Sequence, residues 1–121
     1  MDIQAFWAAV LGQDADRIRP FFHPEATVNW HCTNEQFTVE EYIRANCEYP
    51  GQWDGRMERV EQLGDVTVTA VKVFEAGGQS FHVVSFLRLA EGKIAQLDEY
   101  WGDDGPAPQW RRDKKIGKNI R

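Results

Sequence analysis

The chain has 121 residues, which is enough for one domain with a substantial hydrophobic core. Residues 1–105 hold eight Lys/Arg against 18 Asp/Glu, whereas residues 106–121 hold six Lys/Arg and one Asp. The acidic body argues against nucleic acid as the main partner, since phosphate binding needs a basic surface. No apolar run approaches the ~20 residues of a membrane span, and the acidic start does not fit a signal peptide. We therefore expect a cytoplasmic protein with no membrane partner.

Two short helices are predicted first, each preceded by an aspartate that can cap it. The first runs from Ile3 to about Leu11 and has an apolar stripe on one side. The second runs from Ala15 to about Phe22, and Pro20 is tolerated there only near an end or at a kink. His23-Pro24-Glu25 is expected to form a turn.

A strand and a third helix follow. Residues Ala26 to Cys32 are typical of a strand, and Gln36-Phe37 can form a short return strand. Thr38 followed by Glu41 fits the capping box, which predicts a helix from Val39 to about Cys47.

The second half of the chain predicts an antiparallel meander of four long strands. Gly77-Gly78 is a strong hairpin signal at its centre. The strands are Arg56–Leu63, Val66–Glu75, Gln79–Leu89 and Ile94–Trp101. Helices that are segregated from an antiparallel sheet indicate an α+β fold.

Both faces of this sheet are expected to be apolar. Val84 and Phe86 point to one side of their strand, and Val83 and Leu87 point to the other. Such a sheet should twist and curl around the helices, which leaves a second apolar face to cover. A second copy of the chain is the simplest cover, so we expect a homodimer through the outer sheet face.

The C-terminal residues are expected to form a separate tail. Pro106-Ala107-Pro108 is a stiff connector between the domain, residues 1–105, and the basic residues 106–121. The tail is expected to pack on the acidic body of its own or a partner subunit, and an arm that binds nucleic acid or lipid is the alternative.

The cysteines and histidines indicate no metal site and no cofactor. Cys32 and Cys47 lack a metal or redox spacing, and we expect free buried thiols, with a disulfide as the alternative. His23, His31 and His82 are scattered and form no zinc pattern. Structural or interface roles are expected for His31 and His82.

The last strand carries a single acid among apolar neighbours. Alternation places Ala95, Leu97, Glu99 and Trp101 on one face. A carboxylate desolvated by Trp and Leu would have a raised pKa and could transfer protons near neutral pH. The alternative is a structural glutamate, solvated or paired with Arg59 or Arg88 across the sheet.

The aromatic content also predicts a hydrophobic pocket. The expected lining residues are Phe6, Trp30, Trp53, Met57, Val83, Ser85, Leu97 and Trp101. An aromatic lining suits a small hydrophobic ligand. The alternative is that these side chains fill the interior and leave no cavity.

Three segments carry a resemblance to a known family. They are Phe6–Val10 with Asp14–Ile18 and Phe22–Val28; Val83–Leu89 with Gly92-Lys93-Ile94; and Glu99-Tyr100-Trp101. In this order the chain resembles the nuclear transport factor 2-like superfamily, and within it the SnoaL-like and ketosteroid isomerase-like proteins. The resemblance implies a cone, also called a cystatin-like roll, in which a curved sheet and three helices surround a hydrophobic pocket. It also implies a dimer through the outer sheet face.

The resemblance does not carry over the isomerase chemistry. Steroid isomerases use a tyrosine on the first helix, an aspartate base on the first strand and a protonated aspartate on the strand before the last. By the likeness these positions are Phe6, Trp30 and Ser85, which cannot do that work. Some SnoaL-like cyclases use an acid on a pocket-facing strand, and Glu99 is the residue that fits this role.

Two functions therefore stand side by side. One is proton transfer on a small hydrophobic substrate through Glu99, with Ser85, Asn29 and Tyr42 as orienting groups. The other is a ligand-binding or dimeric association module without catalysis.

Overall fold

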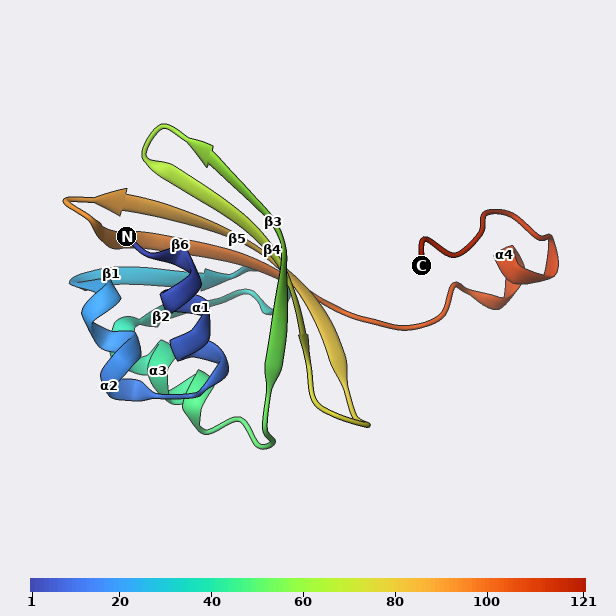
Figure 1. Ribbon diagram of the computed structural model, residues 1–121, viewed down its shortest axis with the longest axis horizontal. Helices are drawn as coiled ribbons and strands as arrows, with labels where there is room; N and C mark the ends of the chain where they lie inside the picture. The colour runs from blue at the N-terminus through green and yellow to red at the C-terminus, as the bar shows by residue number, and fades with distance from the viewer.

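The sheet that dominates the chain has six strands in the order β2-β1-β6-β5-β4-β3. The computed structural model describes residues 1–121 and confirms the expected α+β fold, with helices packed on one face of a curved, unclosed sheet (Figure 1). The strands are β1 (Phe22–Trp30), β2 (Glu35–Thr38), β3 (Asp54–Leu63), β4 (Val66–Phe74), β5 (Ser80–Ala90) and β6 (Lys93–Asp103). The helices are α1 (Ile3–Leu11), α2 (Ala15–Ile18), α3 (Val39–Cys47) and α4 (Gln109–Asp113), with 3₁₀ turns at Arg19–Phe21 and His31–Thr33.

Strand β1 connects the two halves of the chain. It pairs with β2 in antiparallel orientation and with β6 in parallel orientation, and every other pair of neighbours is antiparallel. The meander of β3 to β6 is therefore confirmed. The parallel pair is a long-range contact that the local sequence pattern does not predict.

Helices α1 and α3 begin where their caps predict. The Asp2 carboxylate accepts a hydrogen bond from the Ala5 backbone N–H at 3.0 Å. At α3, Glu41 N–H donates to Thr38 Oγ1 at 3.2 Å and Thr38 N–H donates to the Glu41 carboxylate at 2.9 Å, which completes the capping box. A cap of this kind is worth about 1 kcal/mol, so local sequence fixes both starts.

The second helix is shorter than expected. Helix α2 ends at Ile18, a 3₁₀ turn holds Pro20, and β1 already begins at Phe22. Proline has no N–H to donate and its ring clashes with the preceding turn, so it ends the α-helix here. The turn expected at His23-Pro24-Glu25 is also wrong, because these residues lie within β1, where the pairing with β6 shifts register between Phe22 and Thr27.

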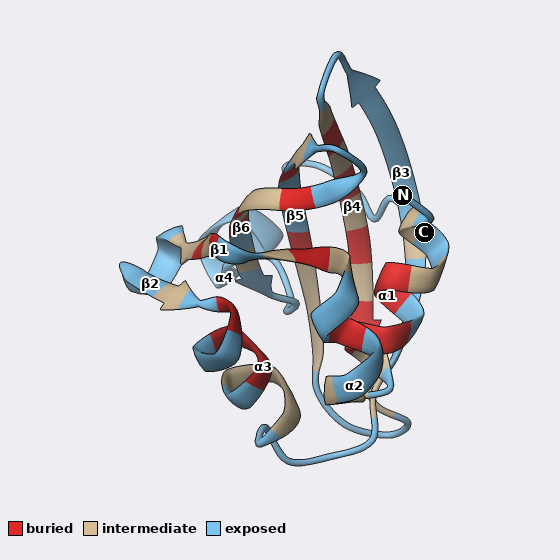
Figure 2. Ribbon diagram, turned by 90° about the vertical axis from the view of Figure 1, so that its left-hand side faces the viewer, coloured by how far each residue is buried: buried red, intermediate tan, exposed pale blue.

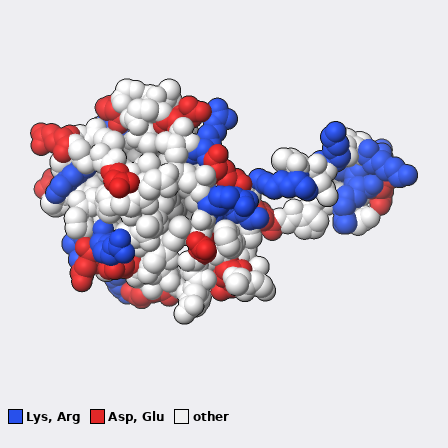
Figure 3. Space-filling view, in the orientation of Figure 1, with Lys and Arg blue, Asp and Glu red and all other residues white.

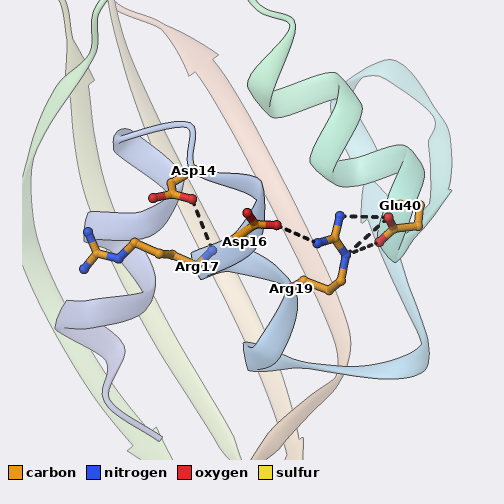
Figure 4. A network of polar contacts seen from close by, with 5 residues as sticks. All are labelled: Asp14, Asp16, Arg17, Arg19 and Glu40. Atoms are coloured by element: carbon orange, nitrogen blue, oxygen red, sulfur yellow. Dashed lines mark hydrogen bonds and ion pairs between the residues drawn. The ribbon is translucent and has the colours of Figure 1, made fainter.

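Ion pairs fix the α2 region against α3 (Figure 4). The Arg19 guanidinium contacts the Glu40 carboxylate of α3 at 2.9 Å and the Asp16 carboxylate at 3.3 Å. Asp14 caps the same turn by accepting from the Arg17 backbone N–H at 3.3 Å. These groups are exposed, and exposed pairs contribute little free energy.

Strand β1 stops two residues before the expected end at Cys32. His31–Thr33 form a 3₁₀ turn instead, and Asn34 takes the left-handed conformation that closes it. The turn leaves Cys32 exposed, so the expectation that this thiol is buried is wrong. Cys47 is half-buried, and both cysteines are free, as expected.

The concave face of the sheet forms the core together with α1 and α3. The β5–β6 register pairs Val83 with Trp101, Ser85 with Glu99 and Leu87 with Leu97. Val83, Ser85, Leu87, Leu97 and Glu99 are fully buried. Figure 2 shows the same alternation as buried segments along β4, β5 and the facing sides of α1 and α3.

The outer face of the sheet remains partly open. Val84, Phe86 and Tyr100 lie on it and are 38%, 39% and 45% exposed. Helices α1 to α3 lie on the opposite face (Figure 1). The sheet is thus apolar on both faces, and one chain covers only one of them.

The tail leaves the end of β6 and extends away from the body, with its basic residues gathered at the far end (Figure 3). Residues 102–121 are all exposed. An ion pair of 3.0 Å joins Arg121 to Glu58 of β3. No helix of the chain is long and apolar enough to span a bilayer.

Candidate functional site

A cavity of about 310 Å³ lies between α1, α3 and the concave face of the sheet. Twelve of the 16 residues that line it are hydrophobic. Four tryptophans contribute, Trp7, Trp30, Trp53 and Trp101, from α1, β1, the loop before β3, and β6. The cavity is therefore an aromatic pocket whose volume lies at the lower end of the range of small-molecule sites.

The expected lining residues divide into two groups. Trp30, Trp53 and Trp101 line the cavity. The others do not: Phe6, Val83, Ser85 and Leu97 are fully buried in the core, and Met57 packs against it. Close packing explains the difference, since Phe6 alone makes edge-to-face contacts with Trp7, Phe21 and Phe22.

Several lining residues were missed by the sequence pattern. Trp7 was expected only in the apolar part of the first helix, and Phe81 only in the β5 strand. Tyr42 was expected as an orienting group but was not among the expected lining residues. Trp7 is the neighbour of Phe6, and one step around α1 takes its ring from the core centre to the cavity wall. Its indole N–H donates to Thr69 Oγ1 at 3.2 Å, which fixes the ring. The only feature of the sequence that could have predicted this position is the width of the apolar face of α1, which includes both Phe6 and Trp7.

Glu99 lies in the floor behind this cavity and is fully buried. Its carboxylate accepts a 2.5 Å hydrogen bond from Ser85 Oγ and a 3.1 Å hydrogen bond from Trp30 Nε1. No salt bridge includes it: Arg59 contacts Glu61 at 2.9 Å, and Arg88 donates to Gln96 at 3.0 Å. The alternative of a glutamate that is ion-paired across the sheet is therefore wrong.

Burial without a cation perturbs this acid. Desolvation raises the pKa of Glu99 from 4.5 to about 6, while the hydrogen bonds from Ser85 and Trp30, and the nearby indole N–H of Trp101, oppose the shift. An acid with this pKa holds a negative charge at neutral pH and still takes up a proton at modest cost.

Two tryptophan rings separate the carboxylate from the cavity. Trp30 and Trp101 meet edge to face with ring centroids 6.1 Å apart, and both line the cavity, whereas Glu99 does not. The indole N–H of Trp101 favours the charged carboxylate, yet it lies outside hydrogen-bond geometry and has no other partner. Trp30 is fixed by its hydrogen bond, and Trp101 is not.

Tyr42 of α3 supplies a polar group on the opposite wall. Its side chain lines the cavity, although the residue is only 2% exposed. Its ring lies 6.3 Å from that of Trp30. Burial and the negative charge of Glu99 raise the pKa of Tyr42 well above its usual value, so the phenol stays protonated.

Asn29 does not belong to this site, contrary to the expectation of an orienting role. It lies on the outer face and donates to Asp98 at 2.9 Å. Asp98 also accepts from Gln96 at 2.9 Å and pairs with His31 at 2.8 Å, and these hydrogen bonds lower the pKa of Asp98 against the effect of its partial burial. His31 stacks on Tyr100 at 4.5 Å. Alternation along β1 and β6 accounts for this separation from Glu99.

His82 has a structural environment as well. It lies between Glu58, at 3.0 Å, and Asp104, and so connects β5 to β3 and to the end of β6. No group of three His, Cys, Asp or Glu side chains is arranged to hold a metal ion.

Comparison with known proteins gives one family match. The model of the SnoaL-like domain matches residues 3–97. No curated protein matches the sequence.

Several solved structures share the fold. One is a protein of Kribbella flavida that was provisionally named a ketosteroid isomerase. It is 19% identical to this chain, with a TM-score of 0.80, and the match covers 98% of this chain and 86% of the Kribbella chain. An NTF-2 like protein of unknown function from Burkholderia xenovorans is 20% identical, with a TM-score of 0.79 over 98% and 92%. An LEH-like epoxide hydrolase of M. tuberculosis is 13% identical, with a TM-score of 0.67 over 83% and 79%. At these identities the likeness establishes the fold alone.

Proposed function

The chain belongs to the SnoaL-like family, and from this premise we propose that it binds a small hydrophobic molecule in the aromatic cavity and that Glu99 exchanges a proton with it. The observation that carries the proposal is the environment of Glu99. A fully buried carboxylate with no cation and a pKa of about 6 lies behind an aromatic cavity. Perturbed acids of this kind are enriched at functional sites.

The chemistry that fits is acid–base catalysis by a single carboxylate. Glu99 would take a proton from the ligand and return it at another atom, which covers isomerisation, cyclisation, dehydration and epoxide opening. Ser85 and Trp30 would stabilise the charged form of Glu99, before the first transfer and after the second, through their hydrogen bonds. Ketosteroid isomerisation by the usual residues is not proposed, because Phe6, Trp30 and Ser85 stand at those positions.

Access to Glu99 requires a side-chain movement. The Trp30 ring donates to the carboxylate and packs against Phe37 with centroids 4.7 Å apart, so it is held on both sides. The Trp101 indole has no hydrogen bond to break. Rotation of Trp101 would break its edge contacts with Trp30 and Phe81 but no hydrogen bond, and it would open a path between the cavity and the acid.

A second candidate is ligand binding without catalysis. The specific observation in its favour is that Glu99 does not itself line the cavity. If Trp30 and Trp101 stay in place, the ligand never reaches the carboxylate, and Glu99 serves only to hold the Trp30 ring through its 3.1 Å hydrogen bond.

One experiment separates the two candidates. Ligands that co-purify with the protein are identified by native mass spectrometry, and the protein is then assayed against epoxides, enones and cyclisable ketones. The key variant is Glu99→Gln. Its matched control is Asp98→Asn, which neutralises the adjacent carboxylate on the other face of β6.

Loss of turnover by about 100-fold or more in Glu99→Gln, with turnover retained in Asp98→Asn, would support proton transfer. Equal ligand binding by all three proteins without turnover of any compound would support the non-catalytic candidate. A protein that binds none of the compounds and carries no ligand would contradict both.

We also propose that the partner of this chain is a second copy, packed through the outer sheet face. The support is the partly exposed apolar group of Val84, Phe86 and Tyr100 at the centre of that face. Multi-angle light scattering at micromolar concentration tests the proposal, and a monomer there would contradict it.

A further inference from the structure

We propose that the aromatic cavity is a cage for an alkylated ammonium group, so that the hydrophobic ligand of this protein is an organic cation such as a trimethylammonium compound. This inference rests on the proposed binding function and names the substrate class for it. Three features of the cavity carry it: a continuous wall of aromatic rings, a lining without basic side chains, and two carboxylates, one at the mouth and one behind the wall.

The wall is a series of rings in which each contacts the next. In order around the cavity the rings are those of Tyr42, Trp30, Trp101, Phe81, Trp53 and Tyr49. Successive centroids lie 5.5 to 6.3 Å apart, and successive planes are inclined by 43° to 84°. Rings inclined in this way form the sides of a box instead of a parallel stack. The electron-rich faces of aromatic rings attract cations, and proteins bind quaternary ammonium groups in such cages.

The lining has a negative charge and no positive one. None of the 16 lining residues is Lys or Arg, and the charged residue among them is Asp103. It follows Trp101 by two positions on the same face of β6 and lies directly opposite Phe81 of β5. Its side chain is exposed and belongs to no ion pair, whereas the adjacent Asp104 is paired with His82. The mouth of the cavity therefore attracts cations and repels anions.

A second negative charge lies on the inner side of the wall. Trp30 and Trp101 separate Glu99 from the cavity, and no cation of the protein neutralises this acid. With a pKa of about 6, it is charged at neutral pH. Attraction between charges is much stronger in a protein interior than in water. A cation in the cavity would be attracted by Glu99, whereas a neutral molecule of the same shape would not.

The test compares two probes of equal shape that differ in charge. The cation is (4-hydroxyphenyl)trimethylammonium, and the neutral probe is 4-tert-butylphenol, in which a carbon atom replaces the charged nitrogen. Titration calorimetry at pH 7 gives the affinities of the full-length protein for both. Each desolvated cation–π contact is worth about 2- to 30-fold in affinity, so the cation should bind at least about 10-fold more tightly than the neutral probe.

Fluorination of the tryptophans tests the role of the rings. Incorporation of 5-fluorotryptophan at all five tryptophans withdraws electron density from the ring faces and changes their shape very little. It should weaken binding of the cation by about 3-fold or more and leave the neutral probe unchanged. The affinity for the neutral probe also reports whether the fluorinated protein keeps its fold.

A pair of neighbouring variants tests the charge at the mouth. Asp103→Asn should weaken the cation by about 2- to 5-fold, as expected for an exposed charge, and should not affect the neutral probe. Asp104→Asn is the matched control, because it removes the same charge from a residue outside the cavity lining that contacts Ser80 and His82. This control should leave both affinities unchanged.

Equal or tighter binding of the neutral probe by the wild type, or equal effects of fluorination on both probes, would overturn the ammonium cage and leave the binding function intact. The same conclusion holds if neither probe binds while neutral epoxides, enones or ketones do. If no compound of either kind binds and no ligand co-purifies, the proposed binding function fails and this inference fails with it.

Discussion

The replacement Glu99→Gln should change how the stability of this protein depends on pH. Glutamine keeps the shape of glutamate and cannot be ionised. The pKa of Glu99 is raised from 4.5 to about 6 in the fold, mainly by burial. The folded state therefore binds the proton more tightly than the unfolded chain does.

The sign and size follow from this difference. A raised pKa gives stability that is fully present below pH 4.5 and is lost as the pH rises through about 6. The difference corresponds to about 2 kcal/mol of unfolding free energy. The wild type should thus lose about 2 kcal/mol relative to Glu99→Gln between pH 4 and pH 7.

Urea denaturation followed by circular dichroism, at half-unit steps from pH 4 to pH 7.5, measures both proteins. Subtracting the two curves of unfolding free energy against pH cancels the contributions of the other carboxylates, because both proteins share them. Glu40→Gln is the control with the opposite sign, since the Arg19 guanidinium lowers the pKa of Glu40. The wild type should lose its advantage over Glu40→Gln as the pH falls. If the curves of wild type and Glu99→Gln stay parallel, the reasoning about the buried acid is refuted.

Four further outcomes are expected. Phe86→Glu on the outer face should convert the proposed dimer to a folded monomer, as measured by light scattering, because the interface would have to bury the new carboxylate without a partner. A dimer that persists in this variant would contradict the proposed interface. Thr38→Ala should lower the unfolding free energy by about 1 kcal/mol, since it removes the capping box of α3, and no change in denaturant midpoint would count against that cap. Leu97→Ala should cost about 2–5 kcal/mol in the same assay, because the residue is fully buried; a loss under 1 kcal/mol would indicate a core that collapses freely. Deletion of residues 106–121 should shift the melting temperature little, since these residues are exposed and the Arg121–Glu58 ion pair is a surface pair; a large loss would mean that the tail packs on a body.

Most of the secondary structure could be predicted from local chemistry. The Asp2 cap and the Thr38–Glu41 capping box set the starts of α1 and α3, and the turn glycines separate the strands of the meander. The errors lie where non-local pairing overrides local pattern. His23-Pro24-Glu25 contains a proline and is typical of a turn, yet these residues lie within β1, between Phe22 and Thr27, which both pair with β6.

The candidate site was only partly predictable. Its acid was found from alternation alone, because period 2 assigns Glu99 to the same face as Leu97 wherever the strand lies. The hydrogen-bond partners of that acid could not be predicted from alternation. Ser85 and Trp30 were expected as separate pocket residues, and both turned out to donate to the same carboxylate.

The sequence by itself therefore determined which side chains share a face, since that depends only on backbone geometry along one strand or helix. The tertiary structure alone decided which faces meet. Trp30 reaches Glu99 from 69 residues away because β1 lies beside β6 in parallel. The placement of α1 and α3 over the sheet decided that Trp7 and Tyr42 line a cavity while Phe6 fills the core. Close packing distributes volume among all neighbours at once, so no local pattern reveals where the space remains.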